Sequence, residues 1–528
     1  MIIKIVTYIL LLATINANAQ RTTILIIADD LSADYFGFYP NYIDTVDVPN
    51  LRKLVNNGIV FTNNMSNPVC SSTRSGILTG RYSFRTGVGG IVGGIGGSNQ
   101  LDTAEVTIPK LLKKFNPLIA KANIGKWHLH QPNPASNLLN PLKTGYDHFE
   151  GPFIGQLPSF TNWTKYTNGV ASNIATYATT ENVNNAITWL KNQNNNSVFL
   201  WLAFNAPHEP LHLPPANLHT FKTLPGSAID IKNNPKSYFK AMIQTMDTEI
   251  GRLFDSLKAM NRFDSTDFIF IGDNGNTPRT AQIADTSKAK GTVYEYGVHT
   301  PLIIAGPSVV NKKRYCNALI NTTDIFATVL ELQGYSNWQS QIPTNKPVDS
   351  KSILPIIKNT ATEIRPWQFC EIFKLIHDSD EAKAIRNMYY KLIHFDYGKT
   401  EFYNLKKDPL ETKSLNNYWS MSADESYNYD YLCGQYVQLT NSVRPCIVTG
   451  INEISKNLTI NIYPNPFTKQ IKINNLATKE CVALFDSYGK CVYNGTDIEN
   501  QDFSKLIIGI YFLKTEKTTI KLIKANEE

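Results

Sequence analysis

Cysteine is scarce in this sequence, with seven in 528 residues. So few cysteines in so long a chain do not make a disulfide framework, so the cores must come from apolar packing. Cys433 and Cys446 are the nearest candidate pair in the central part of the chain, whereas Cys70 stands well apart from the others. Two interpretations of Cys70 are open at this point, a chemical role or an ordinary buried thiol.

Long apolar runs are also absent beyond the first residues. Lys4 precedes an apolar run, and Ala17-Asn18-Ala19 offers the small-x-small pattern of a signal peptidase site. The apolar run is shorter than the ~20 residues that a membrane-spanning helix needs. We therefore predict a signal peptide over residues 1–19 rather than an anchor, and we expect the protein to be exported.

A dense run of Lys or Arg is missing as well, which argues against nucleic acid as a partner. The formal net charge is +7 at pH 7, and Lys4 supplies one of these charges. A mild positive excess suits an anionic substrate or surface without identifying one.

What the chain does contain is a series of short apolar runs separated by longer segments of helical period. The runs are residues 23–28, 198–204, 268–272 and 301–306, and the clearest amphipathic helix spans residues 237–260. Continuous apolar strands are typical of a sheet that helices bury on both faces. The fold class is therefore predicted to be α/β, with a large mixed sheet flanked by helices.

Changes in composition and hydrophobic periodicity along the chain predict its domains. We expect the signal peptide at 1–19, the α/β domain at 20–364, a smaller α+β subdomain with an antiparallel sheet and a linker at 365–450, and a small all-β sandwich at 455–528. The stretch from about 416 to 450 is rich in Tyr, Asn and Ser without clear periodicity, so it is assigned to loop or linker.

Polar side chains follow the predicted strands where each one ends. Asp29 and Asp30 follow the first run, and Asp273 and Asn274 follow the third. Such residues can simply cap turns. In an open α/β sheet, however, the ligand site lies beyond the carboxyl ends of the strands, so two such pairs are expected to converge. Their oxygen ligands favour Ca²⁺ or Mg²⁺.

Cations are embedded in loop motifs of the same part of the chain. Lys126 and His128 lie in "GKWHLH", His208 in "NAPHEP", and Lys290 in "KAKGTVYEYG". A lone histidine is usually a core residue and a lone lysine a solvated one. Together with a metal, these four would form a receptacle for a tetrahedral oxyanion ester, with lysines stabilising charge and histidines transferring protons.

Cys70 and Arg74 in "CSSTR" share one face of a helix that begins near Cys70, because they are spaced i and i+4. The positive amino-terminal end of a helix favours a bound anion. The two residues are therefore expected to face the same anion site.

These motifs resemble the sulfatase family, within the alkaline phosphatase superfamily of metal-dependent hydrolases. The resemblance covers most of residues 21–415 and includes "IIADDLSADYFGFYP", "CSSTRSGILTGRY", "GKWHL", "TPRTAQIADTSKAKGTVYEYGVHTP", "NTTDIFATVLELQGY" and "EFYNLKKDPLETKSL". The segment around Cys70 is similar to the family signature C-x-P-x-R followed by a T-G-R-Y-like segment.

The resemblance implies a metal site and a modified nucleophile. One Ca²⁺, with Mg²⁺ as an alternative, would be held by Asp29, Asp30, Asp273 and Asn274, and the side chain derived from Cys70 would complete the site. In the family this cysteine is oxidised to formylglycine by a maturase. The hydrated aldehyde attacks sulfur, and its second hydroxyl gives a route out of the sulfated state.

The remaining roles are implied in the same way. Arg74 would stabilise the hydrate, and Lys126 and Lys290 would bind sulfate oxygens. His208 would protonate the leaving alcohol, and His128 would take the proton from the second hydroxyl.

The chain departs from the family pattern at a few positions. Ser72 stands where the signature has proline, and Thr73 stands where Ser or Ala is usual. Serine is favoured near helix starts, so we expect the turn to survive. His299 replaces a usual arginine and His130 a common glycine, and either could alter loop packing or the substrate rim.

The last segment also resembles a known module. "NIYPNPF", "VALFDSYGKCVYNG" and "GIYFLK" look like the type IX secretion sorting domain of Bacteroidetes-type bacteria. This implies export across the outer membrane, with release or attachment at the cell surface, and the secretion machinery as a partner. An ordinary carbohydrate-binding β-module is the alternative.

The resemblances imply an enzyme, a secreted or cell-surface sulfatase acting on O-sulfate esters of aryl compounds or glycans. A phosphodiesterase or phosphonate hydrolase of the same superfamily is one alternative. A catalytically silent protein that binds sulfated polysaccharide is the other. Residues 87–97, "GVGGIVGGIGG", suggest either a mobile lid near the site or a loop of tight turns.

Overall fold

The computed structural model describes residues 20–40, 42–415, 417–441, 461–474, 481–487, 489–515 and 519–526. The chain divides between residues 416 and 417 into two compact units. The predicted signal peptide and Cys446 lie outside the described residues. None of the helices formed by the described residues combines the length and apolar character that a membrane span requires.

The first unit is built on a ten-stranded mixed sheet, which confirms the predicted α/β class. Its order is β10-β2-β9-β8-β1-β7-β3-β4-β5-β6. At its centre β8 (Thr266–Gly272), β1 (Thr22–Ala28), β7 (Val198–Ala203) and β3 (Ala120–Gly125) run parallel to one another. The other strands are β2 (Gly58–Met65), β4 (His148–Gly151), β5 (Trp163–Thr167), β6 (Val170–Ile174), β9 (Leu302–Ala305) and β10 (Arg314–Asn321). The carboxyl ends of four adjacent strands therefore meet at one edge of the sheet.

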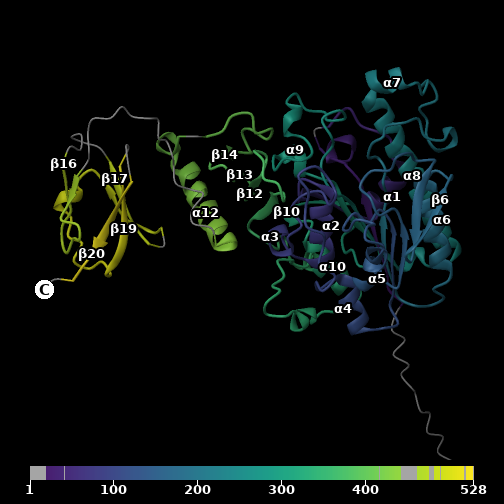
Figure 1. Ribbon diagram of the computed structural model, residues 1–528, viewed down its shortest axis with the longest axis horizontal. Coiled ribbons are helices and arrows are strands. Elements are labelled where there is room, and N and C mark those ends of the chain that lie inside the picture. Colours follow the sequence, from purple (N-terminus) through teal and green to yellow (C-terminus); the bar gives the residue numbers. More distant parts are fainter. Residues whose placement is uncertain are drawn as a thin grey trace, which may run out of the picture. The chain divides into compact units, whose positions relative to one another are not determined.

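Helices cover both faces of this sheet (Figure 1). On β1, Ile24 and Ile26 join one apolar cluster, and Leu25 and Ile27 join the cluster on the opposite face. The first cluster includes residues of α1 (Pro49–Asn56), α6 (Ala178–Lys191) and α8 (Pro235–Ala259). The second includes residues of α2 (Cys70–Thr79), α4 (Ile108–Phe115) and α10 (Asp324–Leu332). Burial on both sides explains why β1 is apolar at consecutive positions.

Short helices complete the loops of this unit. They are α3 (Ser83–Thr86), α5 (Asn140–Lys143), α7 (Ala228–Asn233), α9 (Glu295–Val298) and α11 (Leu354–Ile357).

A second, four-stranded antiparallel sheet closes the first unit, as predicted for the smaller subdomain. Its consecutive strands are β11 (Gln368–Ile372), β12 (Ala382–Arg386), β13 (Tyr390–Phe395) and β14 (Thr400–Asn404). Cys370 and Ile393 of this sheet share an apolar cluster with Val69, which precedes Cys70, and with Val293, which follows Lys290. The small sheet therefore supports loops that carry predicted site residues.

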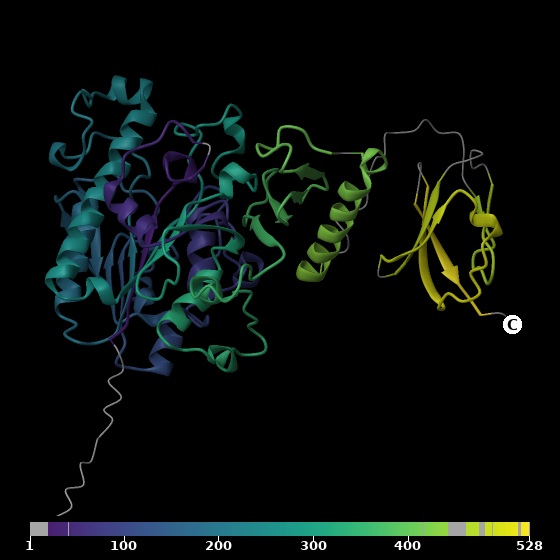
Figure 2. The same cartoon turned by 180° about the vertical axis from the view of Figure 1, so that it is seen from behind.

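The C-terminal unit contains α12 (Ala423–Thr440) and a set of β-strands, drawn in green and yellow in Figure 2. The strands are β15 (Asn461–Tyr463), β16 (Lys472–Asn474), β17 (Val482–Asp486), β18 (Cys491–Gly495), β19 (Gly509–Lys514) and β20 (Thr519–Lys524). They form a two-stranded sheet and a four-stranded sheet in the order β18-β17-β19-β20. An all-β C-terminal module is therefore confirmed.

The assignment of residues 416 to 450 to loop or linker is wrong for α12. The Ser422 hydroxyl accepts a hydrogen bond from the Glu425 amide, and the Glu425 carboxylate accepts one from the Ser422 amide, so a capping box begins the helix. Tyr429, Leu432 and Tyr436 are buried along one face. The helix was missed because its apolar face is carried mainly by tyrosines.

Candidate active site

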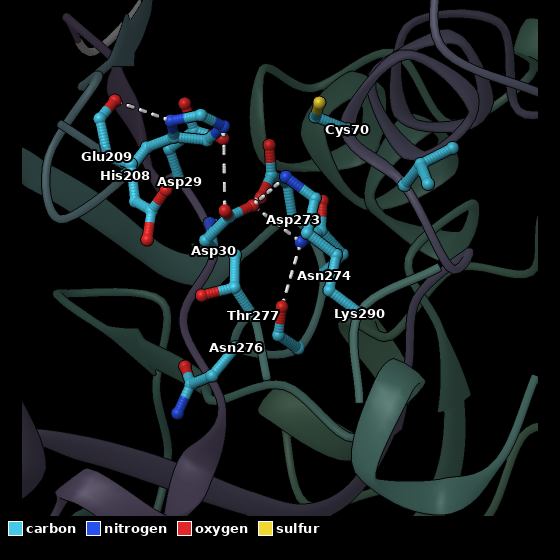
Figure 3. A network of polar contacts seen from close by, with 12 residues as sticks. Asp29, Asp30, Cys70, His208, Glu209, Asp273, Asn274, Asn276, Thr277 and Lys290 are labelled. Atoms are coloured by element: carbon cyan, nitrogen blue, oxygen red, sulfur yellow. Dashed lines mark hydrogen bonds and ion pairs between the residues drawn. The ribbon is translucent and has the colours of Figure 1, made fainter. Parts of the chain in front are cut away.

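Four oxygen-bearing side chains meet at the carboxyl ends of β1 and β8 (Figure 3). The Asp30 amide donates to Oδ1 of Asp273 at 3.1 Å, and Nδ2 of Asn274 donates to Oδ1 of Asp30 at 2.7 Å. Asp30 adopts a positive φ of 62°, which non-glycine residues rarely adopt. This turn aims the side chains of Asp29 and Asp30 into the same buried space.

Several oxygens in this cluster have no hydrogen-bond partner among the described residues. They are Oδ1 of Asp29, Oδ2 of Asp30 and Oδ1 of Asn274. Burial and the neighbouring carboxylates of Asp273 and Asp30 raise the pKa of Asp29 to about 8, although Lys126 opposes the shift. Buried carboxylate oxygens that accept no hydrogen bond are costly unless a cation compensates them. This donor set fits a hard divalent cation such as Ca²⁺ or Mg²⁺.

Two lysines enter the cluster from neighbouring elements. Lys126 follows β3 and places Nζ 2.5 Å from Oδ2 of Asp29, and Nζ of Lys290 lies 2.6 Å from Oδ1 of Asp30. Burial disfavours the charge of Lys290, but Asp30 and Cys70 raise its pKa above the usual range. The ammonium group of Lys290 is therefore held in its charged form beside the oxygen cluster.

His208 follows β7 and faces the other side of Asp30. Its Nδ1 donates to the carbonyl oxygen of Glu209 at 2.8 Å, and its Nε2 lies 3.5 Å from Oδ2 of Asp30. Burial lowers the pKa of His208 to about 4, outweighing the opposite effect of Asp30. The hydrogen bond to Glu209 leaves Nε2 as the nitrogen that faces the cluster.

Cys70 is the first residue of α2, and its sulfur lies 3.2 Å from Nδ1 of His128. The other ring nitrogen of His128, Nε2, lies 3.2 Å from the carbonyl oxygen of Val92. A carbonyl can only accept, so Nε2 carries the proton and Nδ1 presents a lone pair to Cys70. Burial, followed by the nearby Lys126 and Arg74, lowers the pKa of His128 well below its usual value. The imidazole is therefore a neutral acceptor beside the sulfur.

Val92 belongs to the glycine-rich stretch 87–97, and sequence reasoning did not assign it a contact. Its amide donates a hydrogen bond to Oγ of Ser71, and its carbonyl oxygen accepts one from Nε2 of His128. The stretch is thus fixed against the site by backbone groups. A backbone contact leaves no signal in the side-chain sequence, which is why this feature was missed.

Arg74 lies one turn after Cys70 and is completely buried. Its Nε and Nη2 both donate to Oδ2 of Asp273, at 3.0 and 2.8 Å, and its Nη1 donates to the carbonyl oxygen of Lys126 at 3.1 Å. Arg74 therefore ties α2 to the ends of β8 and β3.

The first turn of α2 accommodates Ser72 where the family signature has proline. The hydroxyl of Ser72 donates to the carbonyl oxygen of Val69 at 2.9 Å. The first backbone hydrogen bond of the helix joins the Thr73 amide to Val69, so the Ser72 amide is not needed for it. The turn survives the substitution, as expected.

The two unusual histidines pack loops. His130 receives a hydrogen bond from Nε1 of Trp127 at 3.0 Å and stacks on that ring, while its Nε2 donates to the Leu101 carbonyl. Nε2 of His299 donates to the Thr62 carbonyl at 2.9 Å. His130 thus contacts a loop and its neighbour Trp127, and His299 contacts strand β2, so both side chains are engaged by the protein itself.

The structure thus brings the sequence-predicted site residues into one connected set. A cation held by the oxygens, with two lysines and an arginine, would bind a tetrahedral anion. Two histidines, one on each side, are placed to move protons.

Comparison with known proteins gives three family matches. Residues 21–335 match the family described as Sulfatase, and residues 288–426 match "N-sulphoglucosamine sulphohydrolase, C-terminal". Residues 461–525 match "Secretion system C-terminal sorting domain", which indicates export by type IX secretion.

Individual relatives are distant. Arylsulfatase J of Mus musculus is 25% identical over 354 residues, covering 61% of this chain and 56% of that protein. N-acetylgalactosamine-6-sulfatase of Homo sapiens is 27% identical over 390 residues, covering 66% of this chain and 68% of that protein. The chain thus spans a little over half the length of the mouse relative.

Solved structures share the fold. Ps i-CgsB in complex with k-i-k-neocarrahexaose superposes with a TM-score of 0.66 at 22% identity, covering 80% of this chain and 92% of that one. BT4656 in complex with D-glucosamine-2-N,6-O-disulfate gives a TM-score of 0.62 at 19% identity, covering 81% and 99%.

Proposed function

The chain belongs to the sulfatase family of sulfuric ester hydrolases, and from that premise we propose that it hydrolyses O-sulfate esters of glycans outside the cell. The single observation that carries the proposal is the placement of Cys70 beside His128, at the edge of the buried oxygen cluster. Both solved structures named above contain saccharide ligands, and D-glucosamine-2-N,6-O-disulfate is a sulfated sugar, which supports glycans as the substrate class.

The proposed nucleophile is formylglycine derived from Cys70 by a maturase. Asp29, Asp30, Asp273 and Asn274 would hold one Ca²⁺. That cation would supply the positive charge that neutralises the buried carboxylates and stabilises negative charge on the bound ester. Its unpaired oxygen ligands are already oriented by the turns after β1 and β8.

The chain's own cations would bind and orient the sulfate group. Lys126 and Lys290 reach the cluster from two different loops, so they would hold different sulfate oxygens. Arg74 fixes Asp273 and would stabilise the hydrated aldehyde at position 70, one helical turn away.

The histidines divide the proton transfers between them. His208 presents Nε2 to the cluster because Nδ1 donates to Glu209. In the imidazolium form, which the neighbouring Asp30 favours, Nε2 would also carry a proton and would deliver it to the leaving alcohol. His128 presents the Nδ1 lone pair to position 70 and would accept the proton that must leave the nucleophile for the site to be regenerated.

The remaining parts of the proposal concern location. Residues 461–525 would direct the protein through the type IX secretion machinery of a Bacteroidetes-type bacterium, to be released or attached at the cell surface. The substrate would then be an extracellular sulfated polysaccharide or a fragment of one.

Side-by-side assays test the function. Protein from a host with a formylglycine maturase is given sulfated oligosaccharides and matched phosphate esters, and released sulfate and phosphate are measured. We expect sulfate release that Cys70→Ala abolishes and Cys316→Ala, which removes another buried free thiol, preserves. Phosphate release that persists in Cys70→Ala would favour a phosphodiesterase. Binding of sulfated glycan without turnover of either ester would favour a silent binding protein.

A further inference from the structure

The loop that carries Lys290 is held by buried charges of the small antiparallel sheet. Lys391 of β13 is fully buried and contacts Glu295 and Glu411, its Nζ lying 3.1 Å from Oε1 of Glu295 and 3.0 Å from Oε1 of Glu411. Arg386 of β12 pairs with the other oxygen of Glu295 at 2.5 Å. Two carboxylates and two cations thus form a balanced cluster next to α9, on the side of β12, β13 and β14 (Figure 1).

Glu411 makes the contacts that reach the backbone of this loop. Its Oε2 accepts a hydrogen bond from the Glu295 amide at 2.6 Å, and its carbonyl oxygen accepts from Nζ of Lys288 at 2.5 Å. Lys288 and Glu295 flank Lys290 in the sequence. Glu411 therefore fixes the loop on both sides of the lysine that contacts Asp30.

The opposite side of the same loop lies against the site. The Lys290 amide donates to the Asn276 carbonyl at 2.9 Å, and the Gly291 amide donates to the Pro68 carbonyl at 3.0 Å. Asn276 follows the oxygen ligands of β8, and Pro68 lies two residues before Cys70. The loop is thus clamped between the buried cluster and the backbone that presents the reacting groups.

We propose that Glu411, oriented by Lys391, is a positioning residue for Lys290 in the sulfatase reaction. This inference rests on the proposed function for its kinetic consequence, but its structural content does not depend on catalysis. A displacement of about 1 Å in a charged group that holds the substrate can lower the rate by roughly 100-fold. Glu411 is far from the reacting atoms in sequence and touches none of them directly among the contacts described.

A double-mutant cycle tests the coupling. Glu411→Gln keeps the size of the side chain but cannot accept from both the Glu295 amide and Lys391. We expect kcat/KM to fall roughly 10- to 100-fold in the wild-type background. In a Lys290→Ala background the same change should lower kcat/KM by less than about twofold, because the residue acts through Lys290.

Asp324→Asn is the matched control for a purely structural loss. Asp324 is a buried carboxylate paired with Arg365, away from the Lys290 loop. The Asp324→Asn substitution is expected to lower thermal stability. Its fractional effect on kcat/KM should be the same in the wild-type and Lys290→Ala backgrounds. Equal fractional losses for Glu411→Gln in both backgrounds would overturn the proposal.

Hydrogen exchange provides a reading that needs no substrate. In Glu411→Gln we expect faster exchange of amides in residues 288–298, with exchange in α2 and β8 unchanged. Unchanged exchange in residues 288–298 would overturn the positioning role even if the enzyme were active. An inactive wild-type protein would refute the proposed function instead, and the exchange result would still decide the role of Glu411.

Discussion

The sulfur of Cys70 lies 3.2 Å from Nδ1 of His128, and the Val92 carbonyl fixes the proton of that imidazole on the other nitrogen. Position 70 is therefore paired with a neutral base before any substrate binds. The histidine on the opposite side, His208, contacts Asp30 instead. In the proposed reaction, this arrangement would separate the group that regenerates the site from the group that releases the alcohol.

Replacing His128 with alanine should stop the enzyme after its first turnover. The leaving alcohol departs with help from His208, but the proton at position 70 has no acceptor. Steady-state turnover should fall about 100- to 10,000-fold, while one equivalent of alcohol per enzyme still appears in a rapid burst. Quenched-flow measurement of released alcohol distinguishes the two phases. His130→Asn, on the same loop but hydrogen-bonded to Trp127 and Leu101, should keep near wild-type turnover. Loss of the burst together with turnover would assign His128 an earlier role.

Chelation of divalent cations should lower both activity and thermal stability. The oxygens of Asp29, Asp30 and Asn274 that accept no hydrogen bond would lose the charge of the proposed cation when it is removed. Adding Ca²⁺ at about 100 times its dissociation constant should restore stability by about 2.7 kcal/mol. Calorimetry should show that Ca²⁺ no longer stabilises the Asp273→Ala variant. The control is Asp247→Asn, which changes a buried carboxylate that caps α1, and this variant should still be stabilised by Ca²⁺. A calcium effect that survives in Asp273→Ala would place the cation elsewhere.

Restoring the family proline should leave the fold intact and change maturation. Ser72→Pro removes the hydrogen bond from the Ser72 hydroxyl to the Val69 carbonyl, which contributes about 1 kcal/mol to stability. It breaks no backbone hydrogen bond of the helix, because the first of these is donated by the Thr73 amide. Proline is tolerated in the first turn of a helix. In a host with the aerobic formylglycine-generating enzyme, the modified fraction of Cys70 should rise. Peptide mass analysis measures that fraction, and an unchanged fraction would show that Ser72 does not limit maturation.

Removing residues 442–528 should separate export from catalysis. The first compact unit ends at residue 416, and every proposed site residue lies within it. The shortened protein should retain the specific activity of the full chain but should not leave the cell. Fractionation of the native host and sulfate-release assays measure the two properties. A large loss of specific activity would show that the C-terminal segment contributes to the site.

The strand ends of the large sheet could be predicted from sequence because each combines a local apolar run with the polar residues that follow it. Asp29, Asp273 and His208 were found in this way. The left-handed turn at Asp30 and the Val92 contact depend on backbone conformation, which side-chain patterns do not specify. The contacts of Glu411 with Lys391 and Glu295 join distant segments that no local period relates.

Helix α12 shows a different limit. Tyr429, Leu432 and Tyr436 are spaced for one helical face, and the capping box at Ser422 marks its start. A composition rich in Tyr, Asn and Ser obscured that period, so the periodicity of buried aromatic residues was the signal that could have revealed it.

The formylglycine mechanism is tested most directly by the mass of the tryptic peptide spanning residues 54–74, taken from active protein made in its native host. We expect a peptide in which the Cys70 thiol has been replaced by an aldehyde, with the modified fraction proportional to the rate of sulfate release across preparations. An intact thiol in every molecule of a preparation that still releases sulfate would contradict it.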